Sequence, residues 1–143
     1  MNNLDYKQNI DMDNKIIETK IIAMERAALE EWNNGNPSGY LEIYAEDITY
    51  FDPFQNLRID GWDKMKAFYE TLRGKGHVER YNMINPVVQV WDKTAILTYN
   101  LDSYSDGKLY QWNCTEVYRQ KADGNWEIAH NHWSLVRPMD TKQ

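Results

Sequence analysis

Apolar residues recur at helical spacing near the start of the chain, at Ile17, Ile21, Met24, Ala28 and Trp32. Steps of three and four residues place these side chains on one stripe, which predicts a long amphipathic helix ending at "NNG". The residues before the stripe are mostly polar. We therefore expect residues 1–13 to form a polar N-terminal tail and residues 14–138 to form one domain.

Two shorter helices are predicted after the first one. Asn36 is a favourable N-cap and Pro37 suits the first helical position, so a second helix should run through Leu41 to Tyr44. A third helix should follow "RIDG" and end at Gly74. Its apolar stripe consists of Trp62, Met65, Tyr69 and Leu72.

The remaining pattern predicts strands. "DITYFDPFQNLRI" reads as two short strands around a turn, and everything from Val78 onward reads as strand. Turn signals at "WDK", "SDG" and "ADGN" divide this half into four long strands joined as a meander. Helices followed by a long antiparallel meander indicate an α+β domain in which a curved sheet wraps the helices.

Composition excludes several classes of function. The net charge of −6 and the absence of any Lys/Arg cluster argue against a nucleic-acid partner. Cys114, the single cysteine, excludes an intrachain disulfide and a multi-cysteine zinc site. No apolar run is long enough to span a membrane and the N-terminus lacks signal-peptide features, so we expect a cytoplasmic protein.

The run "WEIAHNHWS" places two histidines two residues apart in the last predicted strand. Strict alternation puts them on one face of the sheet. That face also carries Trp126, Ile128 and Ser134, and the opposite face carries Ala129, Asn131, Trp133 and Leu135.

The turn "ADGN" sets the register of the last hairpin. Asp-Gly favours a two-residue type I′ turn, which pairs Ala122 with Asn125 and places Glu116 opposite Asn131. The same register sets Cys114 beside Trp133, Thr115 opposite His132, Val117 opposite His130 and Tyr118 beside Ala129. Glu116 is then a carboxylate on a mostly apolar, aromatic face, either paired with a buried partner or placed in a pocket that raises its pKa.

The turn "SDG" can be treated in the same way. A three-residue loop with Gly107 left-handed would pair Tyr104 with Lys108 and Asn100 with Trp112. Asn100 would then share the face of Glu116. A two-residue turn would remove it from that face.

Several segments together resemble a known superfamily: "YAEDITYFDPF", "FYETL", "MINP", "TEVYR" and "DGNWEIAHNHWS". They are similar to the SnoaL-like branch of the nuclear-transport-factor-2-like superfamily, most closely to the association domain of calcium/calmodulin-dependent protein kinase II. The likeness covers residues 15–138 and implies a cone-shaped α+β barrel. The superfamily contains isomerases, dehydratases, cyclases and assembly modules, so the fold does not settle the function.

The resemblance also suggests site residues. In ketosteroid isomerases the position matching Glu116 carries an acidic oxyanion-hole donor, and the position matching Trp133 carries a pocket aromatic. Asp52 of "YFDPF" matches their general base, although an Asp before Pro also commonly caps a turn. One ionised base and one protonated acid in an apolar cavity would suit enolisation.

Two departures from these relatives limit the carry-over. The isomerases' helix-borne tyrosine aligns with Ala28, so another tyrosine such as Tyr44, Tyr50 or Tyr118 would have to substitute. The positions matching the cleft arginines of the kinase association domain are Asn100, Glu116 and Trp133, and none is basic. The resemblance therefore implies a neutral or weakly polar ligand.

These observations predict a stand-alone domain that dimerises through the outer sheet face and binds a small, neutral organic molecule. The expected ligand-binding residues are Asn100, Trp112, Cys114, Tyr118, Asn131 and Trp133. The alternative is an isomerase, dehydratase or cyclase that uses Asp52 and Glu116 without cofactor or metal. A third possibility is a structural domain whose cavity is filled by its own side chains. His130 and His132 should lie on the outer face, because the register puts them on the side opposite Glu116 and Trp133. No third metal ligand near them has suitable spacing, so we expect no metal site.

Overall fold

A computed structural model describes residues 2–138, which form three helices and six strands. The helices are α1 (Asn3–Asn33), α2 (Ser38–Ile43) and α3 (Trp62–Glu70). The strands are β1 (Tyr44–Phe51), β2 (Ile59–Asp60), β3 (Arg80–Trp91), β4 (Thr94–Ser105), β5 (Lys108–Gln120) and β6 (Trp126–Leu135).

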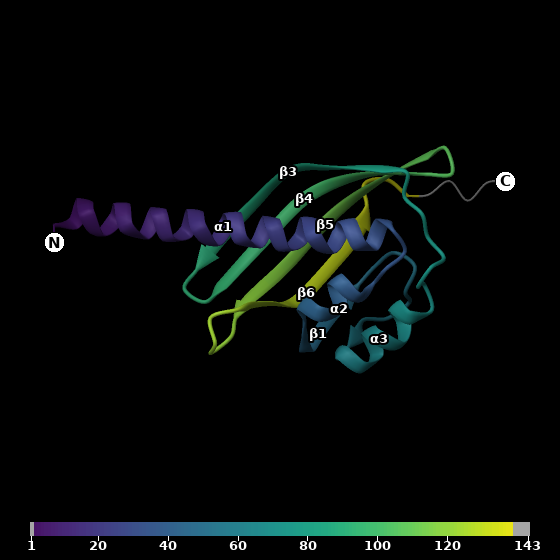
Figure 1. The fold of residues 1–143 in the computed structure, drawn as a ribbon, viewed down its shortest axis with the longest axis horizontal. Coiled ribbons are helices and arrows are strands. Elements are labelled where there is room, and N and C mark those ends of the chain that lie inside the picture. Colours follow the sequence, from purple (N-terminus) through teal and green to yellow (C-terminus); the bar gives the residue numbers. More distant parts are fainter. Residues whose placement is uncertain (1, 139–143) are drawn as a thin grey trace.

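The strands form one curved sheet in the order β2-β1-β6-β5-β4-β3. Every neighbouring pair is antiparallel except β1 and β6, which are parallel. Helix α1 crosses one face of the sheet. Helices α2 and α3 lie beside β1, near the C-terminal end of α1 (Figure 1). The predicted α+β cone is confirmed, with a sheet that curves around the helices without closing.

Helix α1 begins at Asn3, so residues 3–13, which the sequence assigned to a polar tail, are helical. The Asn2 side chain caps the helix by accepting a hydrogen bond from the Asp5 backbone N–H at 2.9 Å. No Gly or Pro interrupts the following turns. The first part of α1 projects beyond the sheet (Figure 1), and residues 2–13 are all exposed. None of the described helices is long and apolar enough to cross a bilayer.

The short helices differ slightly from their predicted bounds. Asn36 Oδ1 accepts from the Ser38 backbone N–H at 3.0 Å, but Pro37 occupies the cap position, so α2 starts at Ser38. It ends at Ile43, because Tyr44 already belongs to β1. Helix α3 buries Met65 and Tyr69 as predicted but ends at Glu70, four residues before the expected Gly74.

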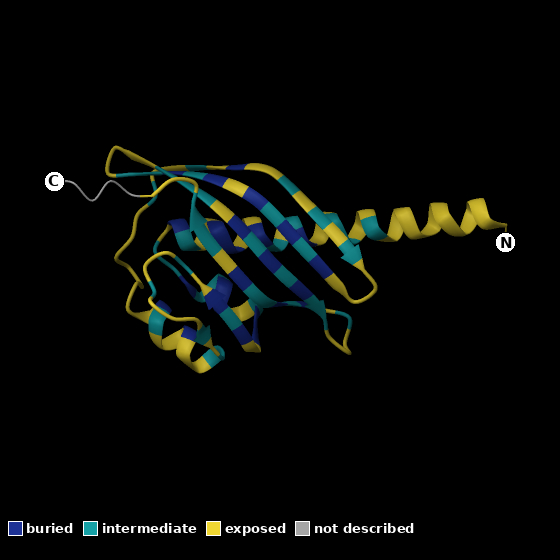
Figure 2. Cartoon of the chain, turned by 180° about the vertical axis from the view of Figure 1, so that it is seen from behind, coloured by how far each residue is buried: buried dark blue, intermediate teal, exposed yellow. Residues whose placement is uncertain are grey.

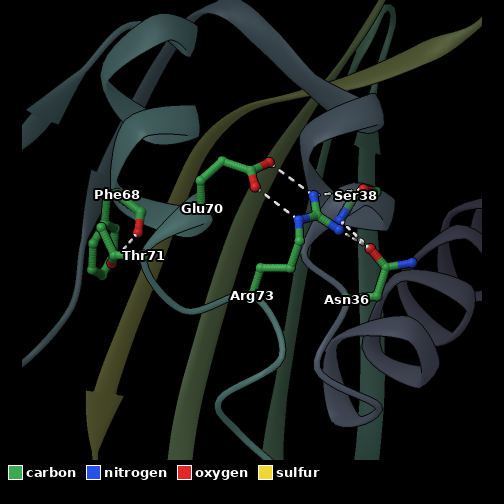
Figure 3. Close-up of polar contacts among 6 residues, drawn as sticks. All are labelled: Asn36, Ser38, Phe68, Glu70, Thr71 and Arg73. Carbon is green, nitrogen blue, oxygen red and sulfur yellow. Dashed lines mark hydrogen bonds and ion pairs between the residues drawn. The ribbon is translucent and has the colours of Figure 1, made fainter.

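An arginine ties the end of α3 to the connection between α1 and α2. The Arg73 guanidinium donates two hydrogen bonds to Glu70, each 2.8 Å long (Figure 3). It also donates to Asn36 Oδ1 at 2.8 Å and to Ser38 Oγ at 2.9 Å. The group is partly exposed, so we expect it to orient these segments more than to stabilise them.

The register of the β5–β6 hairpin is confirmed at Glu116, which pairs with Asn131. The predicted turn is wrong, because Gln120 pairs with Trp126 and Gly124 is the only loop residue with positive φ, at 89°. The loop is therefore one residue longer than predicted, and a bulge at Ala129 restores the register. For the same reason Trp126 and Ile128 lie in the core, and the prediction that they share the histidines' face is wrong.

The β4–β5 turn has two residues, Asp106 and Gly107, with φ of 52° and 72°. Ser105 therefore pairs with Lys108, and Asn100 pairs with Asn113 instead of Trp112. The predicted three-residue loop is wrong. Asn100 is consequently exposed on the outer face, away from Glu116.

Burial alternates along the strands, as Figure 2 shows from the side of the sheet away from α1. The inner face of β4 and β5 packs in the core through Leu97, Tyr99, Cys114 and Tyr118. The outer face leaves several apolar side chains in solvent. They are Phe51 at 38%, Ile84 at 37%, Val87 at 44% and Trp91 at 55% exposure.

Candidate ligand-binding cavity

A cavity of about 610 Å³ lies between the helices and the inner face of the sheet. This volume falls in the usual range for small-molecule sites. Aromatic side chains form much of its lining: Trp32 of α1, Phe68 and Tyr69 of α3, and Tyr110, Trp112 and Trp133 of the sheet. Since the cavity is open, the reading in which Trp and Tyr side chains fill it completely is not favoured.

Asp52 lies at this cavity, directly after β1. Its Oδ1 accepts from the backbone N–H groups of Phe54 at 2.7 Å and Gln55 at 3.1 Å. Its Oδ2 accepts from the Tyr50 hydroxyl at 2.9 Å. Asp52 therefore caps its turn and also lines the cavity, and its role as a general base stays a prediction.

A chain of polar groups runs from the helices to β6. The hydroxyl oxygens of Tyr69 and Tyr44 lie 2.9 Å apart, and the Tyr44 hydroxyl donates to Asn131 Oδ1 at 2.5 Å. The same oxygen accepts from Trp133 Nε1 at 3.2 Å. Asn131 is fully buried. These bonds fix the ring of Trp133, which lines the cavity.

Glu116 lies in the core and is not part of the cavity lining. Cys114 Sγ donates to its Oε1 at 3.3 Å, while its Oε2 is buried without a hydrogen-bond partner among the described residues. Burial raises the pKa of Glu116 well above its usual value, and the neighbouring charge of Glu25 raises it further. Burial likewise raises the pKa of the Cys114 thiol.

Glu25 is a buried acidic residue close to Glu116 that sequence reasoning missed. It is fully buried, and it accepts hydrogen bonds from the hydroxyls of Tyr40 at 2.7 Å, Tyr99 at 2.5 Å and Tyr118 at 3.1 Å. A signal was available, because Glu25 lies four residues after Ile21 and therefore shares the buried stripe of α1.

Glu25, Cys114 and Glu116 each offer an atom within 4.8 Å of the others, so the trio could in principle hold a metal ion. The raised pKa of Glu116 fits another arrangement, in which Glu116 keeps its proton in the buried space beside Cys114 and Glu25. The expectation that the protein uses no metal stays a prediction.

The structure separates the predicted ligand-binding residues into three groups. Trp112 and Trp133 line the cavity. Cys114, Tyr118 and Asn131 point to the same side of the sheet but are buried in the core. Asn100 is on the outer face, which corrects its predicted position.

The tyrosines considered as oxyanion donors are already engaged. The hydroxyl hydrogen of Tyr50 is directed to Asp52, that of Tyr44 to Asn131 and that of Tyr118 to Glu25. A phenol has one hydrogen to donate. A substrate oxyanion could use one of them only by displacing its present acceptor.

The two histidines lie on the outer face, as predicted. His130 Nδ1 is 2.7 Å from Thr49 Oγ1, and the Phe51 ring packs against both imidazoles at centroid distances of 5.8 and 5.2 Å. Partial burial lowers the pKa of His130, and the neighbouring His132 lowers it further. Neither histidine is part of the cavity lining.

Comparison with solved structures places this geometry among known folds. A candidate ketosteroid isomerase from Parabacteroides distasonis ATCC 8503 is similar at 40% identity with a TM-score of 0.79, covering 87% of this chain and 91% of that one. A nuclear-transport-factor-2-like protein of unknown function from Pseudomonas putida KT2440 shares 21% identity with a TM-score of 0.77, covering 90% and 93%. The hub homology domain of CamKII from Chlamydamonas reinhardtii shares 26% identity with a TM-score of 0.69, covering 83% and 98%.

The comparison with family models agrees with these structures. The model of the calcium/calmodulin dependent protein kinase II association domain matches residues 17–136, which includes the whole sheet and most of α1. This chain therefore belongs to the calcium/calmodulin dependent protein kinase II association domain family.

Proposed function

We propose that this domain binds a small organic molecule in its aromatic cavity and associates with a second copy of itself. The observation that carries the binding role is the open volume of about 610 Å³ beneath aromatic side chains. Such concave, apolar sites with a few placed polar groups are the usual form of a small-molecule site. No Lys or Arg is among the described residues that line it, which argues against an anionic ligand.

Filling the cavity tests this role. Ser103 is nearly buried and lines the cavity from β4. Ser103→Phe should abolish binding of fragments detected by ligand-observed NMR in a panel of aromatic and alicyclic compounds. Thr98→Phe, on the outer face of the same strand, is the matched control and should leave binding unchanged. Equal binding by both variants would place the fragments outside the cavity.

The proposal of self-association rests on the outer face of the sheet. Phe51, Ile84, Val87 and Trp91 leave apolar surface there that a second copy could bury. Family members include hub domains, which supports the same conclusion. Light scattering should give twice the monomer mass at micromolar concentration, and Val87→Glu should reduce it to the monomer mass. A monomer mass for the unaltered chain would contradict dimerisation.

An acid/base enzyme is the second candidate, favoured by the position of Asp52 at the cavity. It is weaker, because Glu116 lies in the core outside the lining and cannot meet the same ligand without rearrangement. If the chain does turn over a substrate, Asp52→Asn should abolish turnover while leaving affinity within about tenfold. Unchanged turnover in Asp52→Asn would exclude Asp52 as the base.

A further inference from the structure

We infer that the ligand of this cavity is an organic cation, with its ammonium group seated between Asp52 and the rings of Phe54, Trp112 and Trp133. This inference rests on the proposed function and names the chemical class of its ligand. It departs from the neutral ligand expected from the sequence. The reason is the charge and ring geometry of the lining.

The charge on the described lining of the cavity is negative. Among the described residues that line it, Asp52 is the only charged one. Its carboxylate accepts three hydrogen bonds, two on Oδ1 and one on Oδ2. A carboxylate has about four acceptor positions, so Oδ2 can still accept from a ligand. An ammonium group would neutralise a charge that otherwise faces an apolar space.

The aromatic rings near Asp52 stand almost at right angles to one another. The ring centroids of Phe54 and Trp112 are 6.0 Å apart at 76°, and those of Trp112 and Trp133 are 6.0 Å apart at 84°. The backbone N–H of Phe54 donates to Asp52, which places this wall next to the carboxylate. Rings that stand at right angles are the arrangement from which aromatic cages for quaternary ammonium groups are built.

A second polar anchor lies in the same cavity. Asn33 at the end of α1 lines the cavity and is 5% exposed, and its side-chain Nδ2 is buried without a hydrogen-bond partner among the described residues. An unpaired buried donor is costly, so it marks a place for a ligand acceptor. The preferred ligand therefore combines an ammonium group with a hydroxyl, carbonyl or ester oxygen.

A pair of isosteric probes tests the charge directly. Acetylcholine and 3,3-dimethylbutyl acetate have the same shape and ester, but the second has a neutral tert-butyl group in place of trimethylammonium. Titration calorimetry with the full chain should show acetylcholine binding about tenfold or more tightly than the neutral ester.

Three variants and two controls assign the effect to the aromatic wall and the polar anchors. Asp52→Asn removes the Coulomb attraction for the trimethylammonium group, so it should weaken acetylcholine about tenfold and leave the neutral ester within about threefold. Asp92→Asn, in the β3–β4 turn, controls for the change in net charge. Trp112→Leu should weaken acetylcholine more than the neutral ester, with Tyr6→Leu on the exposed first part of α1 as its control. Asn33→Leu should weaken both esters alike.

Each outcome bears on one claim. Equal affinity for the two esters would overturn the cation assignment and leave the cavity proposal standing. An equal loss of affinity for both esters in Asp52→Asn would do the same. Binding of neither ester would also overturn it, and the fragment panel with Ser103→Phe would then decide the cavity proposal separately. If Asp92→Asn weakens acetylcholine but not the neutral ester, the preference for the cation comes from the overall charge of the protein and not from the cavity.

Discussion

The hydroxyl of Tyr118 on β5 donates a hydrogen bond to Glu25 Oε2 on α1 across 3.1 Å, joining residues 93 positions apart. Removing the donor leaves a buried acceptor with one hydrogen bond fewer, and an unmet buried acceptor costs about 1–3 kcal/mol. We expect Tyr118→Phe to lower the free energy of unfolding by about 2 kcal/mol. Urea denaturation measures this, with Tyr104→Phe on the outer face as control. If Tyr118→Phe lowers the free energy of unfolding no more than Tyr104→Phe does, this hydrogen bond does not stabilise the packing of α1 on the sheet.

Glu116→Gln should stabilise the protein near neutral pH. The pKa of Glu116 is raised in the folded state above its ordinary value of 4.5, so the folded state holds its proton more tightly than the unfolded state. Its favourable contribution is complete below about pH 4.5 and is lost as the pH rises toward the folded pKa, at up to about 1.4 kcal/mol per pH unit. Gln keeps the shape without the ionisation.

The measurement for Glu116 is urea denaturation between pH 4.5 and 8. The unaltered chain should lose stability across this range, and Glu116→Gln should show a flatter profile. Glu46→Gln, an exposed position on β1, is the control and should follow the unaltered chain. Parallel profiles for Glu116→Gln and the unaltered chain would mean that Glu116 does not titrate in this range.

Removal of residues 1–13 should change stability by less than about 0.5 kcal/mol. Residues 2–13 are exposed, and most helical stability in proteins comes from the packing of an apolar face. Ile21→Ala, at a fully buried position further along α1, should instead cost about 2–5 kcal/mol. Denaturation midpoints compare the two, and fast amide exchange over residues 3–13 provides an independent check. A large loss on truncation would indicate contacts made by the projecting segment in an assembly.

His130 should titrate below its ordinary pKa of 6.5, because partial burial and the neighbouring His132 disfavour its charged form. The unfolded chain then binds more protons than the folded one near pH 6, so stability falls as the pH drops through this range and is greatest above it. Arg58 also disfavours the charge, while the Thr49 contact opposes the shift. NMR titration of the imidazole resonances measures the value, and His130→Gln should flatten the pH dependence of stability. A His130 midpoint above 6.5 would contradict this assignment.

Asn33→Leu should raise the stability of the ligand-free protein, or at least not lower it. The side-chain Nδ2 of Asn33 is buried without a partner among the described residues, and an unsatisfied donor costs about 1–3 kcal/mol. Leu has a similar volume and no donor. Thermal unfolding compares it with Asn131→Leu, which removes several hydrogen bonds and should be strongly destabilising. Equal loss in both variants would show that the Asn33 amide is satisfied.

Elements with a long periodic pattern were predictable from the sequence. The apolar stripe through Ile21 and Ala28 identified α1, and the turn signals identified the four-strand meander. The start of α1 was not predictable from this pattern. The Asn2 side chain caps the helix and a polar run without Gly or Pro extends it, although no apolar stripe is present there. Hydrophobic periodicity reports which residues meet the core, and residues 3–13 meet none of it.

The register at Glu116 was correct through two compensating errors. The real turn is one residue longer than the predicted one, and the bulge at Ala129 adds a residue to β6. No local pattern in "IAHNH" marks this bulge. In the neighbouring hairpin nothing compensated for the wrong turn, so Asn100 was assigned to the wrong face.

The candidate site was harder to predict than the fold. Trp112, Trp133 and Asp52 were identified, but the cavity also depends on Asn33, Trp32 and Tyr69, which α1 and α3 bring from distant parts of the chain. Their convergence is a property of tertiary packing. A single charged residue on an apolar stripe, such as Glu25, was the one local sign of the buried carboxylate pair.

The projecting part of α1 affects how the molecule moves in solution. At 31 residues the helix is roughly 46 Å long, and much of its first half stands clear of the sheet (Figure 1). A body with such an arm has more friction than a sphere of equal mass, so it diffuses and sediments more slowly. On a gel-filtration column calibrated with compact proteins, a monomer of 17.0 kDa would therefore elute at too large an apparent mass and resemble a dimer. Only a shape-independent measure of mass distinguishes an extended single chain from a true pair.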